Sequence, residues 1–334
     1  MHLGVLSETR FINFFIYSTK NKFVFSFDLT LYAHVFSLIK KIGVINFLKF
    51  FYPKILLKKH KTISLLLNNK EDNLKNNIYF DTNYFGFVSK KKKLTKNHLV
   101  MPYYLYPKIY NYKYNTLKDF FLEKKTFRIV FSGSIHSSWY GSFKWMNQDG
   151  KTKMLNRNEL IDFVIKEFAS EIYFLKSYQD ILNAEHSNKK IILCLTDQMV
   201  TKKRAKLSNI EHLKFISKSN FFLTAPGTGM PLCHHLIEAI KFRSIPITSY
   251  GHLLNPQLTK DNSLSFDNYR SLYAAIEKSL LMKDEEIKKT QDQLISLYND
   301  HLSPESFLEK FVNAESVKKI ICCNDHESVV RYHM

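Results

Sequence analysis

Apolar residues follow two different spacings along this chain, and the difference is clearest after residue 125. Continuous apolar runs, such as FRIVFSG at 127–133 and KKIILCLT at 189–196, are typical of buried strands. Between such runs, apolar residues recur every three or four positions, as in NRNELIDFVIKEF at 156–168, which indicates amphipathic helices. Strands that alternate with helices of this length indicate βαβ units and a parallel sheet. The pattern therefore predicts an α/β fold.

The hydrophobic pattern also divides the chain into three predicted parts. Residues 1–118 form a first domain, in which short aromatic and β-branched runs predict strands at 11–17, 22–28, 62–68 and 76–81, and a long helix at 31–51. Residues 100–115, which contain two prolines, predict an extended linker. Residues 119–312 form a second α/β domain, and residues 313–334 a short C-terminal helix with a frayed tail.

Glycine and proline residues concentrate in one window, FFLTAPGTGMPLCHHLIEAIKFRSIPITSYGHLLNP at 221–256. It holds three of the nine glycines and four of the eight prolines of the chain. The window predicts a strand, a tight turn and a helix, and ligands of open α/β sheets bind beyond the carboxyl ends of the strands. The turn residues Gly227, Thr228 and Gly229, followed by a helix N-terminus, suit a phosphate. An ordinary connection without a ligand is the alternative.

Residues 220–256 resemble the donor-binding segment of GT-B glycosyltransferases. The likeness is greatest to exostosin-like enzymes and to bacterial capsule and lipopolysaccharide sugar transferases. The shared pattern is a strand with a Pro-Gly turn, a helix with Glu-Ala, and an Ile-Pro strand, here FFLTAPG, HHLIEAI and SIPIT. The resemblance covers about 126–312 and is weak over 1–125. It implies two Rossmann-like domains facing a cleft, the first handling the acceptor and the second binding a nucleotide-sugar donor.

The resemblance also implies roles for individual residues. The turn would bind the donor diphosphate together with Gly133, Ser134 and His234, and Glu238 would bind the ribose. Arg157 would neutralise the charge of the leaving group, and His136 would contact the donor sugar or the acceptor. The sequence departs from the pattern in two places. Met230 and Pro246 stand at the two positions, eight residues from Glu238, where a second Glu would lie. Arg243 and Ser244 replace a Gly before Ile-Pro, so a catalytically degenerate transferase remains an alternative.

Candidates for a catalytic base and for a metal ligand are sparse. If the reaction inverts, Asp28, at the end of a predicted strand, is the candidate base, and a helix N-cap is its alternative role. His234 and His235 are adjacent, and adjacent positions of a helix do not converge on one ion. We therefore assign no metal, and expect no cofactor besides the nucleotide-sugar substrate.

The net charge of +19 is concentrated in the first part of the chain. Residues 1–125 contain 22 Lys and Arg against 7 Asp and Glu. Such a basic region attracts an anionic inner-membrane surface, an anionic glycan or nucleic acid. No helix-turn-helix, ribonucleoprotein or zinc-finger pattern supports the nucleic-acid alternative. The four cysteines lack zinc-site spacing and fit a reducing compartment, and we see no signal peptide. A cytoplasmic protein, peripheral on the inner membrane face, is expected.

Overall fold

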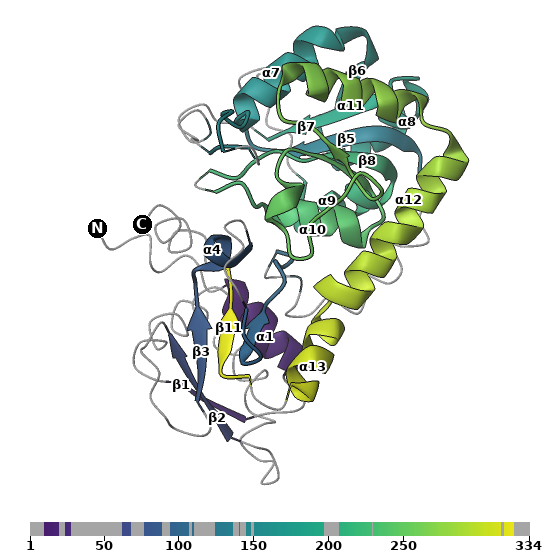
Figure 1. The fold of residues 1–334 in the computed structure, drawn as a ribbon. Helices are drawn as coiled ribbons and strands as arrows, with labels where there is room; N and C mark the ends of the chain where they lie inside the picture. The colour runs from purple at the N-terminus through teal and green to yellow at the C-terminus, as the bar shows by residue number, and fades with distance from the viewer. Residues whose placement is uncertain are drawn as a thin grey trace. The chain divides into compact units, whose positions relative to one another are not determined.

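The computed structural model consists of two compact units, formed by residues 1–115 with 299–334 and by residues 116–298 (Figure 1). It describes residues 10–19, 24–27, 62–67, 77–88, 94–106, 109, 124–135, 140, 145–147, 150–196, 207–228, 230–314 and 317–323. The predicted first boundary at 118 lies close to the observed one. Residues 299–312, which we placed in the second domain, belong to the first unit.

The second unit contains a six-stranded parallel sheet in the order β10-β9-β8-β5-β7-β6. Its strands are β5 (Phe127–Gly133), β6 (Ile172–Phe174), β7 (Ile191–Leu195), β8 (Ser219–Leu223), β9 (Ile245–Thr248) and β10 (Leu264–Ser265). Every residue of β7 is buried, as a continuous apolar run requires when helices cover both faces of a sheet. The predicted α/β class with a parallel sheet is confirmed.

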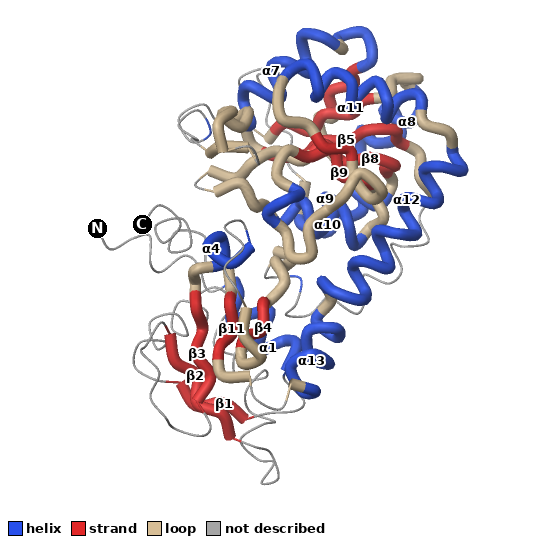
Figure 2. Tube along the Cα trace, viewed as in Figure 1, coloured by secondary structure: helices blue, strands red, loops and turns tan. Residues whose placement is uncertain are grey.

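Helices cover both faces of this sheet, with α7 and α11 on one side and α9 and α10 on the other (Figure 2). The α-helices of the unit are α7 (Arg157–Glu167), α8 (Ile181–His186), α9 (Asn209–Ser217), α10 (His234–Lys241), α11 (Tyr269–Leu281) and α12 (Asp284–Leu297). Short 3-10 turns lie at Ala169–Glu171, Tyr178–Asp180 and Gly251–Leu253, and a π-helical turn at Tyr298–Leu302. The helix predicted at 156–168 is α7, and Asn156 caps it in a capping box with Glu159.

The first unit has its own parallel sheet, in the order β1-β2-β3-β11-β4. The strands are β1 (Val24–Phe27), β2 (Thr62–Leu67), β3 (Asn77–Asp81), β4 (His98–Val100) and β11 (Lys319–Ile321), and the helices are α1 (Arg10–Thr19), α4 (Tyr84–Val88) and α13 (Pro304–Asn313). Two α/β units with parallel sheets are therefore present, as predicted. The cleft between them stays a prediction.

Two sequence-based expectations for the first unit are wrong. Residues 11–17 belong to helix α1 and not to a strand, because the buried faces of Phe14 and Phe15 pack edge-on against Phe307 of α13. Residues 319–321 of the predicted helical tail form strand β11, and Ile320 and Ile321 are fully buried between β3 and β4. Residues 324–334 of the tail lie outside the described residues. Residues 101–106, part of the predicted extended linker, form neither a helix nor a strand. Tyr103 and its neighbours are buried, and the hydroxyl of Tyr104 donates to the carbonyl of Cys323 at 2.9 Å. The helix predicted at 31–51 lies outside the described residues.

Lys125, two residues before β5, gives the second unit a pH-dependent stability. Its ammonium donates to the carbonyl of Phe242 at 2.7 Å, and burial, then the neighbouring Arg243, lower its pKa from 10.5 to about 7. The unfolded chain keeps this amine protonated up to its ordinary pKa, so unfolding takes up a proton between these two values. The free energy of unfolding therefore rises with pH between about 7 and 10. The stabilisation that the neutral Lys125 amine allows is lost as pH falls through 7.

We expect the free energy of unfolding of Lys125→Met to rise less between pH 7 and 10 than that of the unmodified protein. Urea unfolding at pH 7, 8.5 and 10 gives the free energy of unfolding at each pH, and hence its slope against pH for each protein. Lys190→Met, at an exposed position of the same unit, is the matched control and should keep the original slope. An unchanged slope in Lys125→Met would contradict the assigned pKa.

Candidate functional site

The carboxyl ends of β5 and β8 bring two of the predicted ligand-binding segments together. The two strands are neighbours in the sheet, with Ile129 paired to Phe221. β5 ends at Gly133 and continues into Ser134, and β8 continues through Pro226 into Gly227. The structure therefore places four of the predicted site residues, Gly133, Ser134, Gly227 and Thr228, in two adjacent loops at one edge of the sheet.

Arg157 joins these two loops from the first turn of α7. Its side chain is only 4% exposed. Its guanidinium donates to the carbonyls of Pro226 at 3.0 Å and Ser134 at 3.1 Å, and more weakly to that of Ala225 at 3.4 Å. It also lies over the Tyr140 ring, 4.1 Å from the centroid. Arg157 thus fixes the relative position of both loops and supplies a buried positive charge beneath them.

Gly133 and Gly227 differ in how much space they leave for a side chain. A Cβ on Gly133 would lie 3.3 Å from Nη1 of Arg157 and 3.2 Å from the Phe131 ring. A Cβ on Gly227 would lie 2.8 Å from the carbonyl oxygen of Met230, which is closer than a Cβ atom approaches a non-bonded neighbour in proteins. The loop closes on itself through a hydrogen bond from the Gly227 amide to the Pro231 carbonyl, at 3.3 Å. Close packing, and not a left-handed backbone, explains this glycine.

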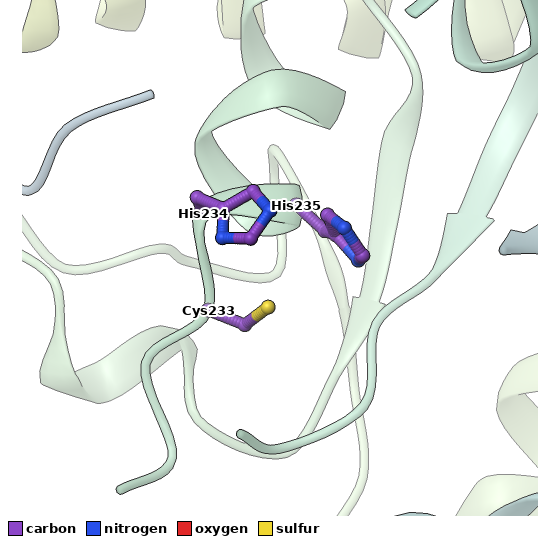
Figure 3. A group of neighbouring side chains, drawn as sticks. All are labelled: Cys233, His234 and His235. Carbon is purple, nitrogen blue, oxygen red and sulfur yellow. The ribbon is translucent and has the colours of Figure 1, made fainter. Parts of the chain in front are cut away.

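Helix α10 begins beside this loop with no side-chain cap. Its N-cap residue, Cys233, makes no capping hydrogen bond, and the first turn has no acidic residue. Figure 3 shows the Cys233 sulfur near the imidazole rings of His234 and His235 at the start of the helix. An uncapped N-terminus presents backbone amides and a positive dipole end, which favour an anion. The helix starts three residues after Pro231, which we had expected in its first turn.

Glu238 is more enclosed than its predicted role suggests. The residue is 1% exposed, and its Oε2 lies 3.2 Å from Nε2 of His212 in α9. In this conformation Oε2 of the carboxylate contacts His212 of α9. The ribose contact of Glu238 stays a prediction.

A cavity of about 330 Å³ opens at the carboxyl ends of β9 and β10. Most of the side chains that line it are polar, and they include Asn147, Thr248, Ser249, His252, Lys260 and Asp267. Asn147 is 6% exposed and Ser249 is 7% exposed. The Oδ1 of Asn147 and the Oγ of Ser249 have no hydrogen-bond partner within the described residues. Both residues line the cavity, and the two atoms are therefore available to a hydrogen-bonding ligand or to water.

Tyr250 connects this cavity to the two loops. It stands between two lining residues, and its hydroxyl donates to the Ala225 carbonyl at 3.2 Å, the same carbonyl that Arg157 approaches. Burial raises the pKa of the Tyr250 hydroxyl, which therefore stays protonated as a donor. The cavity and the loops form one continuous edge of the sheet. The sequence pattern did not predict this cavity, although TSYGH at 248–252, where a predicted strand ends, was a signal for it.

Three predicted site residues, Asp28, His136 and Gly229, lie outside the described residues. None of the four cysteines forms a disulfide within the described part of the chain, and all four are buried. Burial raises the pKa of the Cys194 thiol to about 12, so it is not a nucleophile. No helix in the described ranges is both long and apolar enough to cross a membrane.

No protein-family model matches this chain, and no curated protein matches its sequence. Among solved structures, it is similar to that of WaaG, a glycosyltransferase involved in lipopolysaccharide biosynthesis. The identity is 12% and the TM-score 0.36, over 91% of this chain and 94% of that one. It is also similar to the crystal structure of TarM, with 13% identity and a TM-score of 0.35, over 79% of this chain and 52% of that one. The chain thus spans about half the length of TarM.

WaaG belongs to the lipopolysaccharide sugar transferases, one of the classes that the sequence of this chain resembles. The exostosin-like resemblance stays a prediction. At these TM-scores the likeness assigns neither an activity nor a residue role to this chain.

Proposed function

We propose that the chain is a glycosyltransferase that moves a sugar from a nucleotide-sugar donor to a glycan or lipid-linked acceptor in surface polysaccharide synthesis. The observation that carries this proposal is the polar cavity at β9 and β10, beside two loops that the buried guanidinium of Arg157 holds together. Within the described residues, Asn147 Oδ1 and Ser249 Oγ in this cavity have no hydrogen-bond partner. A nucleotide-sugar has both properties that this edge of the sheet complements: polar donors on its nucleoside and an anionic diphosphate.

The two parts of the site would divide the donor between them. The nucleoside would occupy the cavity, where Asn147 Oδ1 accepts a hydrogen bond and Ser249 Oγ donates or accepts one. The diphosphate would lie at the loop of Gly227 and Thr228, before the start of α10. Arg157 would act from beneath, as a fixed positive charge that is present before the leaving group develops its own.

The acceptor side of the proposal rests on charge. The basic excess in residues 1–125 would attract an anionic glycan or an anionic membrane surface. The catalytic base, for which Asp28 is the candidate in an inverting reaction, would come from this region. His136 would contact the donor sugar or the acceptor.

Titration calorimetry of the purified protein with UDP, GDP and CMP, with and without Mg²⁺, tests the donor site. We expect one of these nucleotides to bind with a micromolar Kd. Ser249→Ala should weaken that binding about two- to tenfold, the value of one hydrogen bond. Its stability should change by less than about 0.5 kcal/mol, because Oγ has no partner within the described residues.

Ser170→Ala, at an exposed position of the same unit, is the matched control and should bind like the unmodified protein. A folded protein that binds none of the three nucleotides, or binds one equally well after Ser249→Ala, would overturn the proposed donor site.

A further inference from the structure

Three side chains from two helices converge at the base of α10. His235 and Glu238 come from α10, and His212 comes from α9. One ligand atom from each, two imidazole nitrogens and a carboxylate oxygen, lie within 4.8 Å of one another. The His212 and His235 rings are 4.5 Å apart between centroids. The adjacent His234 and His235 do not converge on one ion by themselves. His212, from the neighbouring helix α9, completes the set with His235 and Glu238.

The geometry of this trio is close to that of a metal site. The 3.2 Å between His212 Nε2 and Glu238 Oε2 is about the separation of two ligand atoms in a tetrahedral zinc site, roughly 3.3 Å for bonds of about 2.0 Å. The third ligand atom lies within 4.8 Å of both, so a small rotation of a side chain would close the set. Two imidazoles with one glutamate form a known zinc ligand set with an open position.

The charges of the trio also suit a cation. Glu238 places a carboxylate at a position that is 1% exposed, and a buried carboxylate needs a positive partner.

We propose that His212, His235 and Glu238 bind a divalent transition-metal ion, for which zinc is the best match. The ion would tie α9 to α10 and would compensate the buried charge of Glu238. Imidazole and carboxylate ligands without a thiolate suit zinc and its neighbours in the first transition row.

A second set of ligand atoms shares His235 and would use Cys233 and His234 instead (Figure 3). It lacks a carboxylate, and its Cys233 sulfur lies 4.0 Å from Nη2 of Arg157, whose positive charge repels a cation. The trio with Glu238 is therefore the better site.

Zinc content and zinc affinity of the nucleotide-free protein test the proposal. After dialysis against a chelator, the protein should bind one equivalent of Zn²⁺ in a competition titration with a chromophoric chelator. His212→Gln and Glu238→Gln should each weaken binding roughly 100-fold or more, since even outer-shell partners are worth about 10- to 100-fold. His186→Gln, at an exposed histidine of the same unit, is the control and should leave the affinity unchanged.

Cobalt(II) spectra distinguish the two sets of ligands without relying on the stability of a variant. Visible d–d bands of a low-coordinate ion without a thiolate charge-transfer band would support the trio. A thiolate band that disappears in Cys233→Ser would overturn it in favour of the second set. Binding below one equivalent, or binding that His212→Gln leaves intact, would also overturn it. Because no nucleotide is present, failure here is distinguishable from failure of the proposed donor site.

Discussion

Replacing Arg157 by methionine is expected to lower the free energy of unfolding of the second unit by about 3 kcal/mol and to abolish nucleotide binding. The buried guanidinium is the donor for the carbonyls of Ser134 and Pro226. Methionine fills a similar volume but donates no hydrogen bond to these carbonyls, and the loss of a hydrogen bond to a charged group costs about 1.5–3 kcal/mol. Urea unfolding measures the first effect, and calorimetric titration of the folded variant measures the second.

Two further variants make this prediction specific to the geometry of Arg157. Arg157→Lys keeps the charge but has no planar fork, so it cannot reach both loops at once, and we expect an intermediate loss of binding. Arg270→Met, at an exposed arginine in the first turn of α11, should change neither quantity. If Arg157→Met kept both its stability and its nucleotide affinity, the guanidinium would not be what holds the two loops.

Local patterns in the sequence predicted those elements whose residues interact with near neighbours. The capping box of Asn156 and Glu159 spans three residues, and it fixed the start of α7 correctly. Buried strands such as β7 are apolar throughout, so their pattern is visible without any partner. The loop after β8 was predicted from its own turn residues, whereas the resemblance to GT-B glycosyltransferases implied the position of the loop after β5 beside it.

Contacts between distant segments decided the features that the sequence did not reveal. Residues 11–17 contain enough aromatic residues for a strand, and only the packing of Phe15 against α13, almost 300 residues later, selects a helix. The tail became a strand because β3 and β4 leave a place between them for Ile320. His212 lies 26 residues before Glu238, and no spacing rule connects them.

Arg243 adopts a backbone conformation that usually requires a glycine. Arg243 follows the end of α10 with a φ of 56°, in the left-handed region that favours glycine. Its side chain pairs with Asp292 in α12. The backbone therefore makes the turn that a glycine would make, while the side chain adds a contact to another helix.

Gly227→Ala is expected to weaken nucleotide binding roughly 5- to 150-fold while the protein stays folded. The new Cβ would lie 2.8 Å from the Met230 carbonyl oxygen, a backbone atom that moves only if the loop moves with it. Displacing such a loop costs about 1–3 kcal/mol, which the bound state would have to recover. Calorimetric titration measures the affinity, and urea unfolding shows whether the fold is retained.

Thr228→Ala, at an exposed side chain of the same loop, removes at most one hydrogen bond and should lower the nucleotide affinity by no more than about tenfold. An equal or smaller loss for Gly227→Ala would mean that the shape of this loop does not determine phosphate binding.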